Sequence, residues 1–265
     1  MVQPSRSYVL ACTPRVGSHL LSDALTATGI AGRPREWLPR FTPETSPKTP
    51  LERMKLVTQQ PPPDAAHDAA ADAEHIRKVL AYGTTENGVF GIVLHWLVVQ
   101  DAVRRLQAFV GTGESAPHRV LSSAFPNLSY VWLRRRDKVA QAVSWYKAIQ
   151  TGVYVGRHGK GGAGEDDHLQ FDYGQVRYLL TALTSFENAQ GLFFSSAGLT
   201  PLVLYYEDLA AHYVPTIRSV LDFLQLDAEG VEIASPKREK YADARSLEWI
   251  EQFERLHNRA RSTRR

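Results

Sequence analysis

Four short apolar runs along the chain lack regular alternation with polar residues. A strand that faces solvent on one side alternates apolar and polar residues, whereas a strand covered on both faces is apolar throughout. The runs are Ser7–Cys12, Val89–Leu94, Tyr130–Arg134 and Leu202–Tyr206. They predict a sheet that lies between two layers of other structure.

Helical spacing of apolar residues occupies most of the sequence between these runs. The predicted helices are Ser18–Thr28, Asp64–Tyr82, Trp96–Phe109, Asp137–Gln150, Tyr173–Phe193 and Tyr213–Leu224. Strands that alternate with helices form parallel βαβ units. The pattern therefore predicts an α/β fold with a parallel sheet flanked by helices. Such sheets bind their ligands at the carboxyl ends of the strands.

Three segments follow neither pattern. Arg40–Pro63 is rich in Pro, Thr and Ser, Gly152–Asp167 is rich in Gly and charge, and Gly111–His118 is a shorter break. Long connections without secondary structure are often functional, so the two longer segments are predicted to be either lids or plain surface insertions. We expect one domain over residues 1–265, with insertions near 40–63 and 152–167.

The composition supports a full core and excludes several classes of protein. Hydrophobic residues make up 43% of the chain, and the formal charge of +3 is no general signature of nucleic-acid binding. A single cysteine, Cys12, excludes a disulfide framework and a cysteine-rich zinc site, and we expect no bound metal. With neither a membrane-length apolar run nor a signal-peptide pattern, we expect a cytoplasmic protein.

The first apolar run ends in a loop that leads directly into a helix. The first amides of a helix lack internal partners and attract anions. Arg15 adds a cation to this loop, and Thr13 and Ser18 add hydroxyl groups. The loop matches neither G-x-x-x-x-G-K-[ST] nor G-x-G-x-x-G, because it contains no lysine and Gly17 is its only glycine. It predicts a phosphate site, with an ordinary turn as the alternative.

A second candidate anion site follows the third apolar run. Arg134–Arg136 end that strand, and Asp137 is placed to cap the next helix. Gln141, Ser144 and Lys147 share one stripe of the helix. An arginine and Ser144 could hold one phosphate between them, because a guanidinium is bidentate and always charged. A solvated basic turn is the alternative.

Glu36 is a candidate general base. It stands between the turn at Pro34 and the aromatic Trp37. A glutamate among apolar groups can have a raised pKa and accept a proton from a substrate. A surface glutamate without a chemical role is the alternative.

Together these segments resemble the bacterial carbohydrate sulfotransferases typified by trehalose 2-sulfotransferase. Arg15–Leu21 is similar to that family's R-S-G-S-T-L-L, Thr28–Glu36 to T-G-V-A-G-x-P-x-E, and Asn87–Trp96 to N-G-V-W-G-x-K-L-x-W. Arg135–Ala148 resembles R-x-D-x-V-x-Q-A-x-S-x-x-[RK]-A, Tyr206–Leu209 the Y-E-D-L common in sulfotransferases, and Ala242–Trp249 the closing segment. The match runs in order from Tyr8 to Phe253.

The resemblance implies a P-loop-like sulfotransferase fold, a homodimer, and the donor 3′-phosphoadenosine 5′-phosphosulfate (PAPS). It places the 5′-phosphosulfate on the loop residues Arg15, Val16, Gly17, Ser18 and His19, beside Thr13. It places the 3′-phosphate on Arg135 and Ser144 and makes Glu36 the general base. The acceptor would be a hydroxyl of a carbohydrate or a glycosylated small molecule.

The chain departs from this family at two positions. His19 replaces the threonine of the loop, and Val93 replaces the lysine of the G-x-K-L stretch. His95 lies two residues after Val93, on the same face of a strand, and is a second catalytic candidate; a core histidine is the alternative. A P-loop-type kinase or NTPase, or a catalytically weak binder of adenosine bisphosphates, remain the alternative functions.

Overall fold

A parallel sheet of four strands forms the centre of the computed structural model, which describes residues 3–38, 48–58, 68–154, 168–236 and 244–262. The strands are β1 (Arg6–Cys12), β2 (Val89–His95), β3 (Leu128–Arg134) and β4 (Leu202–Tyr205). Their spatial order is β2-β1-β3-β4, and all neighbours run parallel. The α/β fold predicted from the sequence is confirmed.

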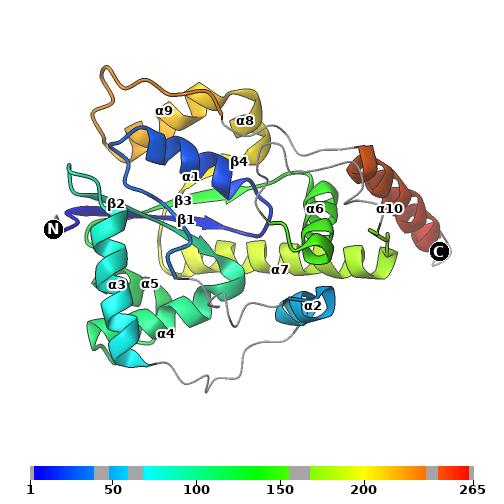
Figure 1. Ribbon diagram of the computed structural model, residues 1–265, viewed down its shortest axis with the longest axis horizontal. Helices are drawn as coiled ribbons and strands as arrows, with labels where there is room; N and C mark the ends of the chain where they lie inside the picture. Colours follow the sequence, from blue (N-terminus) through cyan, green and yellow to red (C-terminus); the bar gives the residue numbers. More distant parts are fainter. Residues whose placement is uncertain (1–2, 39–47, 59–67, 155–167, 237–243, 263–265) are drawn as a thin grey trace.

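Helices cover both faces of the sheet (Figure 1). On one face lie α3 (Ala69–Gly83), α4 (Val99–Val110), α5 (Pro117–Ala124) and α7 (Tyr173–Ser196); on the other lie α1 (Ser18–Ala27), α8 (Tyr206–Ala211) and α9 (Tyr213–Phe223). Beyond the carboxyl end of the sheet stand α6 (Lys138–Thr151), α10 (Ala244–Ser262) and the short α2 (Pro50–Thr58). A 3-10 turn, η1 (Trp96–Val98), joins β2 to α4.

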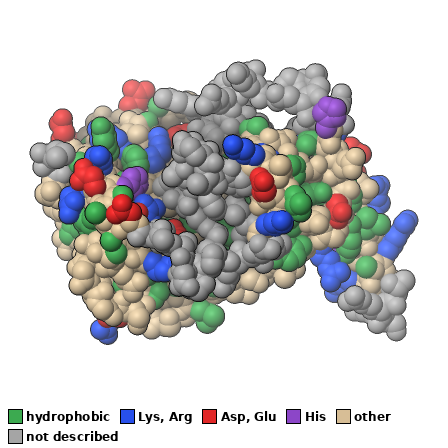
Figure 2. All heavy atoms as spheres, turned by 60° about the horizontal axis from the view of Figure 1, so that its bottom comes forward, with side chains coloured by type: hydrophobic (Ala, Val, Ile, Leu, Met, Phe, Trp, Pro, Cys, Tyr) green, Lys and Arg blue, Asp and Glu red, His purple; other side chains and the backbone are tan. Residues whose placement is uncertain are grey.

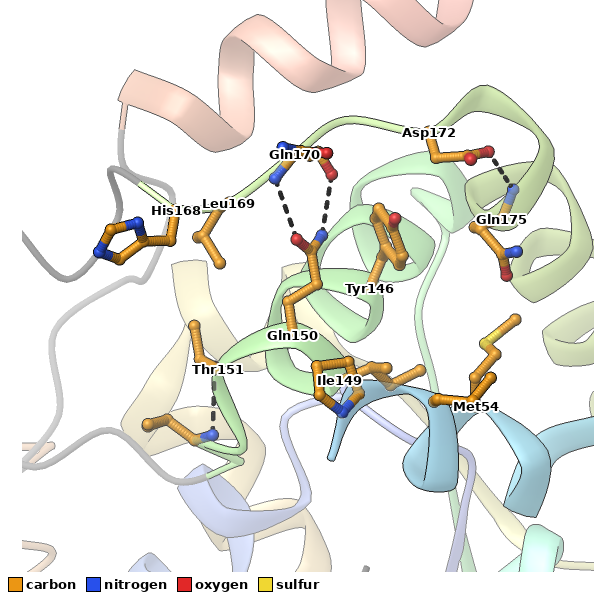
Figure 3. Close-up of a pocket in the computed structure, with 13 residues that line it drawn as sticks. Met54, Tyr146, Ile149, Gln150, Thr151, His168, Leu169, Gln170, Asp172 and Gln175 are labelled. Carbon is orange, nitrogen blue, oxygen red and sulfur yellow. Dashed lines mark hydrogen bonds between the residues drawn. The ribbon is translucent and has the colours of Figure 1, made fainter. Parts of the chain in front are cut away.

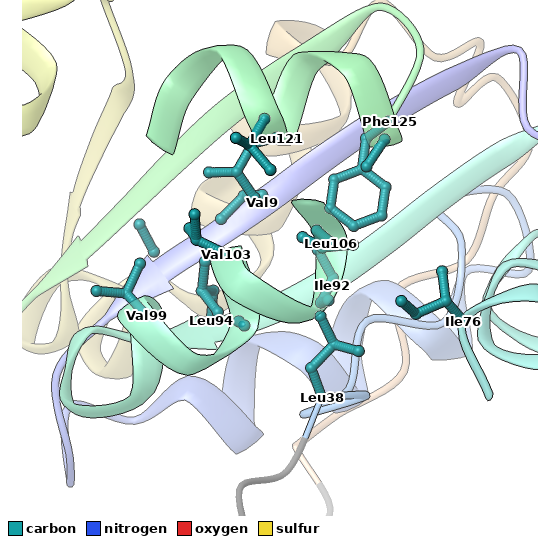
Figure 4. Close-up of a cluster of buried hydrophobic side chains, with 14 of the residues drawn as sticks. Val9, Leu38, Ile76, Ile92, Leu94, Val99, Val103, Leu106, Leu121 and Phe125 are labelled. Carbon is teal, nitrogen blue, oxygen red and sulfur yellow. The ribbon is translucent and has the colours of Figure 1, made fainter. Parts of the chain in front are cut away.

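Three apolar clusters correspond to these layers. One joins the sheet to α3, α4, α5 and α7, and includes Val9, Ile92 and Leu106 (Figure 4). A second joins the other face to α1, α8 and α9. The third holds α6, α7 and α10 together around Trp145 and Trp249. β1 and β2 are buried on both faces, and both are apolar almost throughout, as the sequence pattern indicated.

The expectation that Arg40–Pro63 lacks secondary structure is wrong, because α2 lies within this segment. Glu52 donates its N–H to the hydroxyl of Thr49 at 3.2 Å, and the Glu52 carboxylate accepts the N–H of Thr49 at 3.0 Å. This capping box, with Pro50 as the first helical residue, starts the helix despite the surrounding prolines and threonines. Residues 39–47 and 59–67 lie outside the described part.

Three further helices are absent from the prediction. α5 begins at Pro117, inside the expected break Gly111–His118. α8 directly follows β4, and α10 is the last helix along the chain. The predicted helix Asp64–Tyr82 is α3, whose N-cap is Asp68; residues 64–67 lie outside the described ranges. Of the expected insertion Gly152–Asp167, only Gly152–Tyr154 is described.

The parallel register brings the carboxyl ends of three strands together. Cys12 at the end of β1 pairs with His95 at the end of β2, and Ala11 pairs with Trp132 near the end of β3.

On the face shown in Figure 2, Lys and Arg side chains lie among Asp and Glu side chains and form no basic patch over the described atoms. No described helix is both long and apolar enough to cross a membrane.

Candidate active site

The loop between β1 and α1 has a conformation that depends on glycine. Gly17 is the N-cap of α1 with φ 93°, and a Cβ there would lie 2.5 Å from Cδ2 of Tyr206. Arg15 also has a positive φ of 62°, which is uncommon for a residue with a side chain. Glycine carries no side-chain acceptor, so no N-cap side chain bonds to the first turn of α1, and a helix N-terminus of this kind attracts anions.

Gln141 of α6 is hydrogen-bonded to this loop. Its side chain is fully buried, and its Nε2 donates to the hydroxyl of Thr13 at 2.9 Å and to the carbonyl of Pro14 at 2.7 Å. A buried amide that makes two hydrogen bonds is costly to displace. The loop is therefore held in shape by the helix that follows β3.

Arg15 links the two candidate anion sites. Its Nε donates to Oγ of Ser144 at 3.0 Å, and its NH1 donates to the carbonyl of Tyr154. Its own carbonyl accepts a hydrogen bond from Arg135 at 3.3 Å. Ser144 and Arg135, the predicted pair for one phosphate, are thus joined through Arg15.

The three consecutive arginines have different roles. Arg134 pairs with Glu187 at 2.6 Å, and Arg136 makes a bidentate pair with Asp208 at 2.8 and 2.6 Å. These two arginines of the basic cluster are therefore held in structural ion pairs.

Arg135, in contrast, is directed at the loop. Its guanidinium lies 4.9 Å from the centre of the Tyr206 ring, and its Nε is buried without a hydrogen-bond partner among the described residues. Burial lowers the pKa of Arg135, and the nearby Tyr206 and Asp137 only partly offset this. A partly desolvated cation with an unused donor is suited to an anionic ligand.

Glu36 lies within a cluster of histidines. Its Oε1 is 3.0 Å from Nε2 of His95 and 3.7 Å from Nε2 of His19. Sγ of Cys12 lies 3.4 Å from Nδ1 and 3.9 Å from Nε2 of His95, so the sulfur packs against the imidazole ring. The Glu36 side chain is 46% exposed, and that of His95 is 15% exposed. Glu36 and His95, which the sequence presented as competing bases, form one hydrogen-bonded pair.

These contacts set the charges of the pair. Burial works to raise the pKa of Glu36, but the charge and hydrogen bond of His95, together with His19, lower that pKa to about 2. Burial works to lower the pKa of His95, yet Cys12 and Glu36 raise it well above 6.5. The raised pKa that the sequence suggested for Glu36 is therefore wrong, because the apolar neighbours in sequence are not its nearest neighbours in space.

Backbone contacts place Glu36 beside β2. The N–H of Val93 donates to the carbonyl of Arg35 at 2.8 Å, so the segment that carries Glu36 runs next to the strand that carries His95. Arg35 also pairs with Asp23 of α1 at 3.2 Å. The Val93 side chain is buried in the same cluster as Cys12, which confirms that residues 93 and 95 share a face.

A pocket of about 700 Å³ opens beside the carboxyl end of α6. Its walls come from α2, the end of α6, Val153 and the stretch that enters α7 (Figure 3). Gln150 and Gln170 hold two walls together, with hydrogen bonds of 2.9 and 3.0 Å. Tyr146 faces this pocket, whereas its neighbour Trp145 is a core residue. Trp37 and Trp96 pack on the first apolar cluster.

Comparison with known proteins identifies the family. The model of the Stf0 sulphotransferase family matches residues 7–256. This chain belongs to the Stf0 sulfotransferase family. It is 30% identical over 269 residues to the trehalose 2-sulfotransferase of Mycobacterium tuberculosis strain Erdman, covering 96% of each chain. It is also 30% identical over 264 residues to the trehalose 2-sulfotransferase of Mycolicibacterium smegmatis, covering 94% of each chain.

Membership confirms the family resemblance and the fold, and it makes this Stf0 sulfotransferase an enzyme of sulfuryl transfer. Sequence reasoning did not single out Cys12 and Tyr206 as neighbours of the site, or the anchoring role of Arg35. Periodicity carries no signal for them, because each acts through a contact between distant segments. The described residues contain no group of three or more His, Cys, Asp or Glu that could hold a metal ion.

Proposed function

We propose that this enzyme transfers a sulfuryl group from PAPS to a hydroxyl of a carbohydrate, with Glu36 as the general base. The observation that carries the proposal is the Glu36 carboxylate, held by two histidines next to an anion-binding loop. The names of the two relatives support a carbohydrate acceptor, and trehalose is the first to test.

The donor set of the site suits the two anionic ends of PAPS. Arg15, His19 and the first amides of α1 supply donors for the 5′-phosphosulfate, and Gly17 and Ser18 let the backbone approach it closely. Arg135, whose buried Nε–H has no partner among the described residues, suits the 3′-phosphate, and Ser144 lies within reach of Arg15. Thr13 and Val16 shape the loop; Val16 is fully buried and Thr13 is tied to Gln141.

Sulfuryl transfer exchanges one oxygen on sulfur for another. The acceptor oxygen bonds to sulfur as the bond from sulfur to the 5′-phosphate oxygen breaks, and the electron pair of that bond stays on the phosphate. Arg15 and the loop amides neutralise the charge that develops there. Glu36 takes the acceptor proton, which becomes strongly acidic as the new oxygen–sulfur bond forms.

Glu36 is better placed than His95 to be this base. Nε2 of His95 is engaged by Glu36 at 3.0 Å, and the His95 side chain is only 15% exposed, whereas that of Glu36 is 46% exposed. Both histidines contact Oε1 of Glu36, and we assign Oε2 to the acceptor hydroxyl. A carboxylate with a pKa of about 2 is fully ionised at neutral pH. It is a weak base toward a free alcohol, but a sufficient one toward an oxygen that already bonds to sulfur.

The pocket beside α6 is our proposed region for the acceptor. Both segments expected to be insertions contribute to it, through Leu51 and Met54 on one side and Val153 on the other. Tyr154, next to Val153, contacts Arg15 through its carbonyl. Tyr146 offers an aromatic face of the kind that stacks on sugar rings.

The test is a sulfation assay with PAPS and a panel of sugars that begins with trehalose, with products identified by mass spectrometry. Glu36→Gln should lower kcat about 10²–10⁴-fold and leave the affinity for adenosine 3′,5′-bisphosphate nearly unchanged. Glu251→Gln, an exposed change on α10, is the matched control. Full turnover by Glu36→Gln would remove Glu36 as the base. Transfer of phosphate from ATP would favour a kinase instead.

A further inference from the structure

The Y-E-D-L segment at the start of α8 lies against the turn that carries Arg135. The ends of β3 and β4 are paired, so the residues that follow the two strands start side by side. Oε1 of Glu207 lies 3.0 Å from the backbone N of Arg136 and 3.1 Å from that of Asp137, and Oε2 lies 3.1 Å from the N of Arg136. One carboxylate thus accepts hydrogen bonds from the two backbone N–H groups that follow Arg135.

We propose that Glu207 is a positioning residue for Arg135: its carboxylate holds the backbone next to Arg135, so that the guanidinium stays directed at the 3′-phosphate of the donor. The proposal rests on the proposed function, in which Arg135 binds that phosphate. It assigns a role to a motif that the sulfuryl-transfer mechanism leaves unused.

The side-chain contacts of Arg135 leave its position dependent on the backbone. Its guanidinium donates to the carbonyl of Arg15 over a long 3.3 Å and lies 4.9 Å from the centre of the Tyr206 ring. Its Nε has no hydrogen-bond partner among the described residues. An arginine held this loosely reaches a fixed point only from a fixed backbone, and a ligand-binding group that is already in place binds more tightly.

The charge of Glu207 works against a bound phosphate, which separates positioning from simple electrostatics. Burial works to raise the pKa of Glu207, but the N–H groups of Arg136 and Asp137 and the charge of Arg135 lower it, so the carboxylate is ionised at neutral pH. An anion beside an anion-binding arginine repels the phosphate. Any favourable effect of Glu207 on phosphate binding therefore comes from its hydrogen bonds.

The experiment compares Glu207→Asp with Glu207→Gln. The aspartate keeps the charge but is one methylene shorter, which draws its oxygens away from both N–H groups. The glutamine loses the charge but keeps an oxygen in the place of Oε1, which accepts both N–H groups in the wild-type protein. Asp208→Asn is the matched control, because Asp208 lies on the same turn and pairs with the side chain of Arg136 rather than with a backbone N–H.

The first readout is the affinity for adenosine 3′,5′-bisphosphate and for AMP, measured by calorimetry. The second is NMR of the ligand-free protein, which follows the Arg135 Nε–H signal and the exchange of the Arg136 and Asp137 amide hydrogens with solvent. Chemical denaturation establishes that each variant is folded.

Glu207→Asp should lose most of a preference of about ten- to a hundredfold for the bisphosphate, shift the Arg135 signal and exchange both amides faster. Glu207→Gln and Asp208→Asn should keep the preference. The proposal would be overturned if Glu207→Asp bound like the wild-type protein, or if Glu207→Gln lost the preference. If the wild-type protein binds both nucleotides equally, the 3′-phosphate assignment fails, while the NMR signals still decide whether Glu207 positions Arg135.

Discussion

Glu36 and His95 illustrate why a titrating group has to be understood from its neighbours in space. The sequence places Glu36 between proline and tryptophan, which suggests a raised pKa. The structure places two histidines on one of its oxygens, and the pKa falls to about 2. Nothing in the sequence could reveal this, because residues 36 and 95 meet only through the pairing of the Arg35 segment with β2.

His95→Asn should raise the pKa of Glu36 toward its ordinary value of 4.5. The change removes the cation that lowers this pKa, whereas His19 remains. In the wild-type enzyme, Glu36 should stay ionised between about pH 4 and 7, so its protonation should not change the rate there. The variant should lose activity as the pH falls through about 4 to 5, because its Glu36 becomes protonated. A pH profile of kcat/KM and a carbon NMR titration of Glu36 measure this. Identical titrations in both proteins would contradict it.

Arg135 and Arg136 are adjacent in sequence but differ in what they contact. We expect the wild-type protein to bind adenosine 3′,5′-bisphosphate about ten- to a hundredfold more tightly than AMP, because a charge-assisted contact to phosphate contributes about 1.5–3 kcal/mol. Arg135→Gln should abolish this preference. Arg136→Gln should retain it, because that side chain is engaged by Asp208. Calorimetric titration decides, and equal wild-type affinities for both nucleotides would refute the 3′-phosphate assignment.

The strands and most helices were predictable because apolar positions mark the faces that they bury, and the four predicted strands agree with the structure within two residues at either end. The prediction failed where local chemistry outweighs composition. The capping box at Thr49 starts α2 within a segment rich in proline, and Pro117 opens α5 inside an apparent break. α10 was missed because its buried side is narrow, with Trp249 and Phe253 four residues apart in a helix that is otherwise mostly polar.

The N-cap of α6 should influence donor binding, because this helix carries Gln141 and Ser144. The carboxylate of Asp137 accepts the N–H of Ala140 at 2.8 Å. Asp137→Ala should destabilise the fold by about 1 kcal/mol and also weaken the binding of adenosine 3′,5′-bisphosphate. Asp68→Ala removes the corresponding cap of α3, far from the loop in sequence, and should affect only stability. Chemical denaturation and calorimetry separate the two effects, and equal binding by both variants would count against this role of α6.

The arrangement of the whole molecule explains how one edge of the sheet serves two ends of a ligand. β1 lies between β2 and β3, so its loop meets Glu36 and His95 on one side and Arg135 on the other. Strand order of this kind is not encoded in periodicity, which identifies strands but not their neighbours. The sequence predicted that the two arginine sites lie at strand ends, and the register of β1 with β3 brings them into contact.

We expect the protein to form a homodimer, as the resemblance to the carbohydrate sulfotransferases implies. Large apolar side chains are exposed away from the proposed acceptor pocket, including Leu192 of α7 and Leu247 of α10, and association would cover such groups. Sedimentation at micromolar concentration should show a species of twice the 29.6 kDa chain mass. A single species at the chain mass would contradict the dimer.

The Tyr206 ring occupies the space where a side chain at position 17 would stand, and it also lies under the guanidinium of Arg135. Positions 17, 135 and 206 are therefore expected to vary as a set in an alignment of this family. A relative with alanine or serine at the position of Gly17 should carry a smaller residue in place of Tyr206. Such a relative would have no aromatic ring beneath the arginine at position 135. We therefore expect it either to lack that arginine or to show no preference for a 3′-phosphate.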